Sequence, residues 1–200
     1  MQKKKILKLL IGSNNPGKIK EIKDLLPNHI QILAPSDYKL RSPKENGKTF
    51  KQNSLIKAKF FSRKTKMICL ADDSGLEVDL LNGEPGIYSS RWAGKKNNFN
   101  LAINKVYKEL NKKDKNWFIK NKSASFVCAL TIYWPNNSFV SVVGKVHGTI
   151  SKYTKGKNGF GYDPIFIPKN SKLTFGQMKT SLKYKIDHRM KAFNKFKKFF

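Results

Sequence analysis

The sequence predicts a mixed α/β fold built on one central sheet with flanking helices, and two observations carry this prediction. Strand-like and helix-like segments alternate through the first half of the 200 residues. A hairpin pattern of two strands, 124–134 and 139–150, follows in the second half. With 39% hydrophobic residues, the chain can bury one compact core or two lobes that share a sheet. We therefore expect residues 1–200 to form a single functional domain.

The first half begins with an apolar strand at 5–12, followed by a loop and a helix. Asn15 and Pro16 are typical of a helix start, because an Asn side chain accepts from free N–H groups and proline fits the first turn. A second helix is expected from Thr49 to Lys66, since Thr49–Gln52 has the form of a capping box. Two strands then follow, with a short acidic bend between them. Their ranges are 67–71 and 76–81, with the bend at 72–75.

The second half opens with a turn, after which Ile103, Val106 and Leu110 recur at the spacing of a third helix. The sequence then predicts an exposed lysine-rich loop, the hairpin, a short strand and one amphipathic C-terminal helix. Apart from the hairpin, these segments are the turn at 82–86, the loop at 112–122, the strand at 165–167 and the helix at 182–200.

The net charge of +28 is the most prominent compositional feature. Lysines are spread along the whole chain, and they accompany many Asn, Ile and Phe residues, which share A/T-rich codons with lysine. A nucleic-acid reader would use arginine in one patch for bidentate contacts. We therefore expect a lysine-coated surface without a specific nucleic-acid partner. Weak nonspecific binding of RNA or DNA would follow from the positive electrostatic field of the lysines. The arginines are Arg41, Arg63, Arg91 and Arg189.

The apolar segments indicate a cytoplasmic protein without a membrane partner. No apolar run approaches the roughly 18 residues of a membrane span, and a polar segment follows the first strand where a secretion signal would have its cleavage site. Cys69 and Cys128 lie in apolar stretches typical of buried strand thiols, and no disulfide framework is expected.

Two segments in the first half could bind phosphate and metal. Residues 13–18, which end in Gly17 and Lys18, open a helix with unpaired N–H groups and a lysine, which suits a phosphate; the alternative is an ordinary capped helix. Adjacent Asp72 and Asp73 are costly to bury unless a cation relieves their repulsion, and magnesium prefers carboxylate and phosphate oxygens. The alternative there is a polar turn.

Two segments in the second half could recognise a nucleobase. Phe160 and Tyr162, on a glycine-rich loop, could stack on a base while Asp163 accepts hydrogen bonds; the alternative is a tight loop with one buried aromatic. His188 and Arg189, six residues or fewer after Lys183, could donate to the 6-keto group of a purine. The alternative is a set of surface charges on an amphipathic helix.

Taken together and in order, these segments resemble the dITP/XTP pyrophosphatase family, also called inosine triphosphate pyrophosphatases. The resemblance runs from Ile11 to Arg189, and chance agreement across all its specific stretches is implausible. These stretches are Ala71–Val78, Gly86–Arg91, Gly159–Phe166 and His188–Arg189.

The resemblance implies magnesium-dependent hydrolysis of dITP, ITP or XTP to the monophosphate and pyrophosphate. It implies that Asp73 is the proton acceptor and contacts Mg²⁺, with Glu45 as the second metal-site acid. The remaining implied residues contact the nucleotide, and Phe160 is the stacking ring. They are Ser13, Asn14, Asn15, Pro16, Gly17, Lys18, Asn53, Lys57, Ser74, Phe160, Gly161, Tyr162, Asp163, Lys183, His188 and Arg189.

The resemblance also implies a homodimer, and two lobes around an active-site cleft. The chain departs from the family pattern at Gln177, where an acid is common, and at Asp187, where a small serine is usual. Both leave the order of preference among ITP, dITP and XTP open. Two rival functions remain at this point: a pyrophosphatase for modified pyrimidine nucleotides, and a nucleic-acid-binding protein favoured by charge alone.

Overall fold

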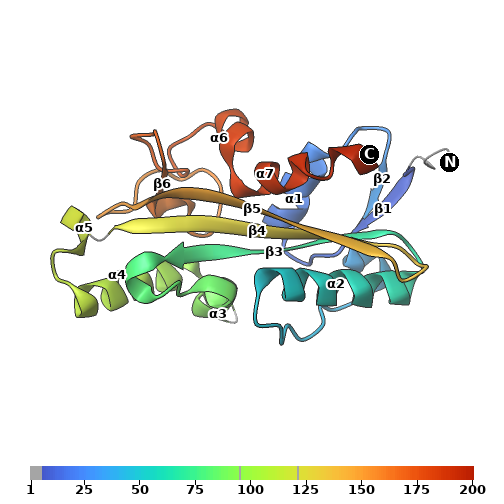
Figure 1. Cartoon of the computed structure of the whole chain (residues 1–200), viewed down its shortest axis with the longest axis horizontal. Helices are drawn as coiled ribbons and strands as arrows, with labels where there is room; N and C mark the ends of the chain where they lie inside the picture. Colours follow the sequence, from blue (N-terminus) through green and yellow to red (C-terminus); the bar gives the residue numbers. More distant parts are fainter. Residues whose placement is uncertain (1–5, 95, 121) are drawn as a thin grey trace. The chain divides into compact units, whose positions relative to one another are not determined.

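The described residues form a mixed sheet with flanking helices, which confirms the predicted fold class (Figure 1). The computed structural model describes residues 6–94, 96–120 and 122–200. Their six strands have the order β2-β1-β3-β4-β5-β6; β1 runs parallel to β2 and β3, and β6 runs antiparallel to β5. The strands are β1 (Lys8–Ile11), β2 (Gln31–Leu33), β3 (Cys69–Val78), β4 (Ser123–Tyr133), β5 (Phe139–Ile150) and β6 (Phe166–Pro168).

Helices connect or follow most of these strands. The α-helices are α1 (Pro16–Leu25), α2 (Phe50–Thr65), α3 (Ser89–Trp92), α4 (Phe99–Lys113), α5 (Trp117–Lys120), α6 (Thr180–Ile186) and α7 (His188–Asn194). Short 3₁₀ segments lie at Pro35–Tyr38, Asp79–Leu81, Gly86–Tyr88, Asp163–Ile165 and Lys197–Phe199. None of the helices within the described ranges is long and apolar enough to cross a membrane.

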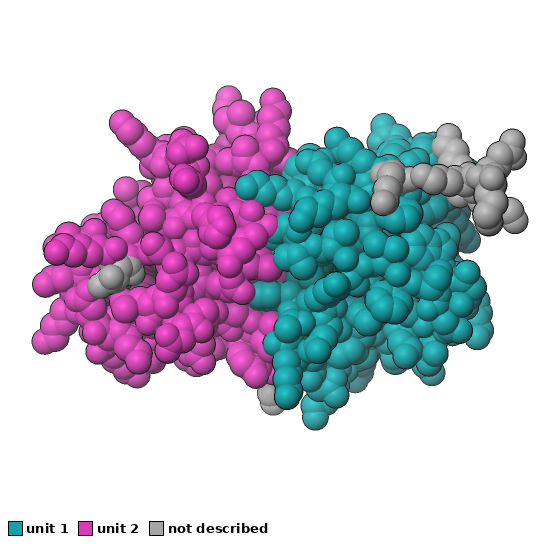
Figure 2. Space-filling model, viewed as in Figure 1, with its two compact units in different colours: residues 1–73, 128–144, 189–200 teal, residues 74–127, 145–188 magenta. Residues whose placement is uncertain are grey.

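The chain divides into two compact units, which Figure 2 colours separately. Unit 1 comprises 1–73, 128–144 and 189–200, and unit 2 comprises 74–127 and 145–188. The three long strands β3, β4 and β5 each contribute residues to both units. The expectation of one functional domain over 1–200 stays a prediction.

Unit 1 is a three-layer structure in which successive strand residues serve opposite faces. Leu9 and Ile11 of β1 join the core beneath α1 and α7, whereas Leu10 joins the core beneath α2. The same alternation holds in β3, where Leu70 belongs to the first core and Cys69 to the second. Helix α2 accordingly lies on one side of these strands, and α1 and α7 lie on the other (Figure 1).

Unit 2 has a core of its own, rich in aromatic side chains. Helix α4 buries Ala102, Ile103, Val106 and Leu110 in it, as the helical spacing predicts. The rings of Phe126, Phe166 and Phe175 pack against one another in the same core, with centroids 4.6 to 5.9 Å apart.

Both predicted helix starts are confirmed. The Asn15 side chain accepts from the Lys18 N–H, Pro16 is the first helical residue, and Thr49 accepts from the Gln52 N–H. The reciprocal bond of the capping box differs, because the Gln52 side chain accepts from the N–H of Lys48, one residue before the cap, at 2.6 Å. The predicted burial of Cys69 and Cys128 is also confirmed.

The predicted bend at 72–75 is wrong. β3 continues without interruption from Cys69 to Val78, and it ends in the 3₁₀ turn at Asp79–Leu81 rather than at Leu81. β3 pairs with β1 at Cys69 and Leu70, and its other hydrogen-bonded neighbour is β4. Pairing along a central strand satisfies the backbone groups, so it outweighs the turn preference of Asp, Ser and Gly.

Two further expectations for the second half are also wrong. The single C-terminal helix is divided at Asp187, whose extended backbone (φ −72°, ψ 168°) separates α6 from α7. The segment 112–122 is not wholly an exposed loop, since α4 extends to Lys113 and α5 follows. Trp117 in α5 is buried, and its indole N–H donates to the Asn111 side chain at 2.9 Å, so one aromatic residue anchors a lysine-rich stretch.

Candidate active site

The adjacent acids Asp72 and Asp73 lie on opposite faces of β3. Side chains alternate along a strand, so Asp72 shares the face of Leu70, toward α1 and α7, whereas Asp73 shares the face of Cys69, toward α2. The sequence interpretation, in which the two neighbouring carboxylates together hold one cation, is therefore wrong. Each carboxylate is in direct contact with different cations.

Asp72 belongs to a buried charged cluster. Its Oδ2 atom lies 3.3 Å from the Lys18 ammonium and 3.1 Å from Nη2 of Arg189, which also pairs with Glu21. Burial raises the pKa of Asp72, but Lys18, Arg189 and Lys57 lower it by more, so the pKa lies well below its ordinary value. Asp72 is therefore an ionised structural anion that aligns two cations.

Asp73 faces the ammonium group of Lys57 on α2. Lys57 Nζ lies 3.1 Å from Asp73 Oδ1 and 3.1 Å from Glu45 Oε1. Burial raises the pKa of Asp73, and although Lys57 and Lys18 lower it, burial and the nearby Glu45 prevail, so the pKa lies above its ordinary value. A carboxylate with a raised pKa is a better proton acceptor.

Glu45 and Asp73 form a donor set that suits magnesium. The Oδ2 atom of Asp73 is buried and has no hydrogen-bond partner among the described residues, while the Glu45 side chain is 28% exposed and can be reached from solvent. Over the described ranges, no cluster of three or more His, Cys, Asp and Glu is placed to hold a metal. Magnesium typically uses one or two protein carboxylates, waters and substrate phosphates, so two carboxylates fit it.

The predicted phosphate loop at 13–18 is compact. The Ser13 hydroxyl accepts from the Asn15 N–H at 3.1 Å, and Asn15 caps α1. Asn14 points elsewhere: its amide group donates to Leu40 O at 3.3 Å and to the Ser42 hydroxyl at 3.1 Å. The N–H groups at the start of α1 and the Lys18 charge therefore remain the anion-binding features of this loop.

In unit 2, Asp163 organises the glycine-rich loop. Its Oδ2 atom accepts from Lys183 Nζ at 2.7 Å and from the Phe160 N–H at 2.8 Å. Gly159 has φ +72°, and a Cβ there would lie 2.0 Å from the same oxygen. The Lys183 ammonium lies 5.4 Å from the centre of the half-buried Phe160 ring, so Asp163 holds both residues in one arrangement.

Other predicted contacts in unit 2 occupy different surroundings. Tyr162 is 2% exposed, and its hydroxyl donates to Ser89 O, so its ring is part of the core, in line with the alternative of one buried aromatic. His188 stacks on Phe126 with centroids 4.8 Å apart. Ser74 lies half-buried on β3, and Gly161 has φ +69°, with the Phe99 ring 3.6 Å from the place that a Cβ would take.

The alternative of surface charges on the C-terminal segment is wrong. Lys183, His188 and Arg189 are all buried, with 5% exposure at most. Sequence reasoning missed Glu21, the partner of Arg189. A signal was present, because Glu21 lies three residues after Lys18, on the same side of α1, directly before the buried Ile22.

The two departures from the family pattern are accommodated locally. The exposed Gln177 accepts from the Thr174 N–H through its Oε1 at 3.1 Å, a bond that a carboxylate could also accept. Asp187 is 2% exposed and lies at the break between α6 and α7. Their effect on substrate preference stays a prediction.

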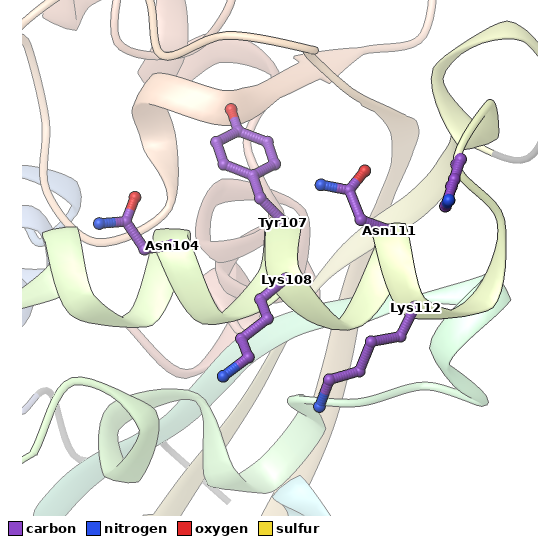
Figure 3. A pocket seen from close by; sticks show the side chains of 6 residues that line it. Asn104, Tyr107, Lys108, Asn111 and Lys112 are labelled. Carbon is purple, nitrogen blue, oxygen red and sulfur yellow. The ribbon is translucent and has the colours of Figure 1, made fainter.

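A separate pocket of about 720 Å³ lies along α4 (Figure 3). None of the predicted site residues lines it. Its lining side chains follow one another at helical spacing along a single face of α4 and just beyond its end, so it is a surface hollow of one helix. They are Asn104, Tyr107, Lys108, Asn111, Lys112 and Lys115.

The fold and the site in unit 1 define a class: a mixed α/β protein with a capped, lysine-bearing helix start and three lysine-paired carboxylates, suited to a phosphorylated ligand. Comparison with known proteins gives the particular family. Residues 9–199 match the Ham1 family, and the chain belongs to that family.

Its relatives include the dITP/XTP pyrophosphatase of Caulobacter vibrioides, 42% identical over 190 residues that cover 95% of this chain and 96% of that protein. The dITP/XTP pyrophosphatase of Bacillus subtilis is 37% identical over 198 residues, covering 94% of each. Among solved structures, the Ham1 protein of Coxiella burnetii aligns with a TM-score of 0.85 and 34% identity, covering 96% of each chain. The Ham1 protein of Staphylococcus aureus aligns with a TM-score of 0.83 and 34% identity over 96% of this chain and 97% of that one.

Proposed function

We propose that this protein hydrolyses the deaminated purine nucleotides dITP, ITP and XTP to the monophosphate and pyrophosphate, removing them from the nucleotide pool. The main structural support is the position of the Lys57 ammonium, which lies 3.1 Å from both Glu45 and Asp73. The chain is also 42% identical to a dITP/XTP pyrophosphatase. Such a centre supplies a base, a cation and two carboxylate ligands within one compact group.

In this proposal Asp73 takes the proton from the attacking water. Its raised pKa favours proton transfer from the water, while the Lys57 ammonium lowers that pKa and so favours the ionised form. Glu45 and Asp73 would hold Mg²⁺, which when bound supplies a positive charge that offsets the charge of the phosphate oxygens. The water attacks the α-phosphorus, and the α–β bond breaks to release pyrophosphate.

Lysines neutralise the charge that develops on the leaving pyrophosphate. Lys18 stands at the start of α1, where the helix N–H groups add a partial positive charge, and Asp72 holds its ammonium in place. Lys57 contributes a second positive charge from α2, and we assign Lys183 the same role in unit 2. Positioned cations of this kind account for most of the catalysis expected in phosphoryl transfer.

We assign recognition of the base to the second group of predicted residues. Phe160 offers a half-buried ring for stacking, and His188 and Arg189 carry donors that suit a 6-keto purine and oppose the amino group of adenine. We propose that the protein acts on free nucleotides in the cytoplasm and that it acts as a homodimer.

A release assay tests this function directly. Purified protein with Mg²⁺ is incubated with ITP, dITP, XTP, GTP, ATP and dUTP, and both pyrophosphate and inorganic phosphate are measured. The proposal expects pyrophosphate with ITP, dITP and XTP and far slower release with ATP, whose 6-amino group opposes the donors. GTP shares the 6-keto group, so its rate shows whether the protein also discriminates the group at position 2 of the base. Preferred turnover of dUTP would favour the modified-pyrimidine alternative, and release of single phosphates would contradict the proposal.

The high charge makes nucleic-acid binding the second candidate. With a net charge of +28, the protein is expected to bind RNA and DNA weakly, with affinity falling as salt rises. Tight binding in physiological salt together with absent pyrophosphate release would favour this candidate over the enzyme.

A further inference from the structure

Glu45 lies on a segment that forms neither helix nor strand. Residues 40–47 run between the 3₁₀ turn at Pro35–Tyr38 and helix α2 without regular hydrogen bonding, yet they deliver Glu45 Oε1 to within 3.1 Å of Lys57. A segment of this kind has many conformations open to it, and each ordered residue costs about 1–2 kcal/mol of backbone entropy. The position of Glu45 therefore depends on contacts that other parts of unit 1 make with this segment.

The first such contact comes from the phosphate loop. The side-chain amide of Asn14 donates to Leu40 O at 3.3 Å and to the Ser42 hydroxyl at 3.1 Å. Asn14 is exposed, so water competes for these bonds and each contributes modestly. They attach the beginning of the segment to the loop before α1.

The second contact comes from α2, at the other end of the segment. The Asn53 Oδ1 atom accepts from the Gly47 N–H at 2.8 Å, and the Asn53 side chain is fully buried. A Cβ at Gly47 would lie 2.7 Å from the same oxygen and 2.7 Å from the Gln52 side chain. The segment therefore packs against the first turn of α2 so closely that no side chain fits at Gly47.

Asn53 and Lys57 are four residues apart and therefore lie on the same face of α2. Asn53 binds the backbone N–H of Gly47, two positions after Glu45, and Lys57 binds the Glu45 carboxylate itself. Because both residues belong to α2, this helix rather than the irregular 40–47 segment sets the position of Glu45 relative to Lys57 and Asp73.

We propose that Asn53, assisted by Asn14, is a positioning residue that holds Glu45 beside Asp73 for binding a divalent cation. This inference rests on the proposed function, which assigns Glu45 and Asp73 to the metal. It gives Asn53 and Asn14 roles that act through the 40–47 segment, in addition to the direct nucleotide contact expected from the resemblance, which stays a prediction.

The test is Mn²⁺ binding to the protein without nucleotide, followed by electron paramagnetic resonance. Asn53→Leu removes the acceptor for Gly47 with little change in volume, and it is expected to weaken Mn²⁺ binding about 10-fold, as loss of a partner that orients a ligand typically does. Asn14→Ala is expected to weaken binding by a smaller factor. Asn136→Leu is the matched control, since Asn136 also accepts a backbone N–H, from Ser138, in another loop of unit 1.

A double-mutant cycle with Glu45→Gln shows whether Asn53 acts through Glu45. In the Glu45→Gln background, Asn53→Leu is expected to cause no further loss of Mn²⁺ affinity. An equal loss in both backgrounds, or wild-type affinity in Asn53→Leu, would overturn the inference.

Two further measurements keep the outcome decisive. Hydrogen exchange of the Gly47 amide is expected to accelerate in Asn53→Leu and to stay slow in Asn53→Asp, which keeps an acceptor. If Asn53→Leu does not fold, Gly47→Ala disturbs the same contact through a change in the 40–47 segment, because the added Cβ would collide with Asn53. This variant is also expected to weaken Mn²⁺ binding, and unchanged affinity would overturn the inference. The pyrophosphate assay stands apart, because wild-type protein that binds Mn²⁺ but hydrolyses no nucleotide contradicts the proposed function and leaves the positioning result intact.

Discussion

Asp72 and Asp73 are neighbours in sequence that project to opposite faces of β3, so Lys18 and Arg189 bind one carboxylate and Lys57 binds the other. The pKa values of the two acids are therefore shifted in opposite directions. The cations around Asp72 lower its pKa, whereas burial and Glu45 leave the pKa of Asp73 raised. This division separates a structural anion from a proton acceptor, and it leads to predictions that distinguish the two positions.

Replacing Asp73 by Asn is expected to reduce pyrophosphate release at least about 100-fold, because general base catalysis typically contributes 10²- to 10⁴-fold. Nucleotide binding is expected to remain measurable, since Lys18 and Lys57 still attract the phosphates. Turnover of dITP and calorimetric titration with the same nucleotide measure the two effects. An Asp73→Asn protein with near wild-type turnover would remove Asp73 from the mechanism.

Replacing Asp72 by Asn is expected to act on stability in a pH-dependent way. Because the folded pKa of Asp72 lies below the unfolded value of about 3.9, its stabilisation is present above about pH 4 and is lost as the pH falls toward the folded pKa. At pH 7 the free energy of unfolding of the variant should fall by about 3 kcal/mol, because Lys18 loses its buried partner and Arg189 keeps Glu21 but loses the Asp72 charge. Urea unfolding of metal-free protein at pH 7 and pH 3 checks this, and a deficit that grows at pH 3 would contradict it.

Replacing Lys57 by Met removes the cation between Glu45 and Asp73. Lys57 lowers the pKa of Asp73, so its loss raises that pKa further and moves the acidic limb of the kcat profile to higher pH. The free energy of unfolding at pH 7 is expected to fall by about 3 kcal/mol. Lys51→Met, at an exposed position of the same helix, is the control and should change neither quantity. An unshifted pH profile in Lys57→Met would show that Lys57 does not tune the base.

Gly159→Ala is expected to disturb the loop that carries Phe160. The residue has φ +72°, and the added Cβ would collide with Asp163 Oδ2, which binds Lys183. Gly83→Ala is a matched control, because Gly83 has φ +86° with nothing within 4 Å of the added atom. Backbone strain alone costs about 1–2 kcal/mol, so the free energy of unfolding of the control should fall by that amount. The free energy of unfolding of Gly159→Ala should fall by more.

Thermal unfolding and the KM for dITP measure this difference. The KM is expected to rise in Gly159→Ala only, because the collision displaces Asp163 and the residues it organises. Equal losses of thermal stability in both variants would indicate that the collision with Asp163 contributes nothing to the effect.

Local sequence signals predicted those elements whose ends carry their own hydrogen-bonding side chains. Asn15 and Thr49 cap α1 and α2 as expected, because a cap depends on residues only a few positions apart. The same locality explains the failure at 72–75. Turn-forming residues were overridden by pairing of β3 with β4, a strand from a distant part of the chain that no short window contains.

The sequence by itself determined the mixed α/β class, the order of most elements and the set of acids and lysines from which the candidate site is built. Only the tertiary structure decided which charges meet: Arg189 joins Glu21 across 168 positions, and it joins Asp72 across 117. The physical reason is that composition fixes the charges a chain carries, whereas strand alternation and helix packing fix the face on which each charge is buried. Burial and partner together then set the pKa that separates Asp72 from Asp73.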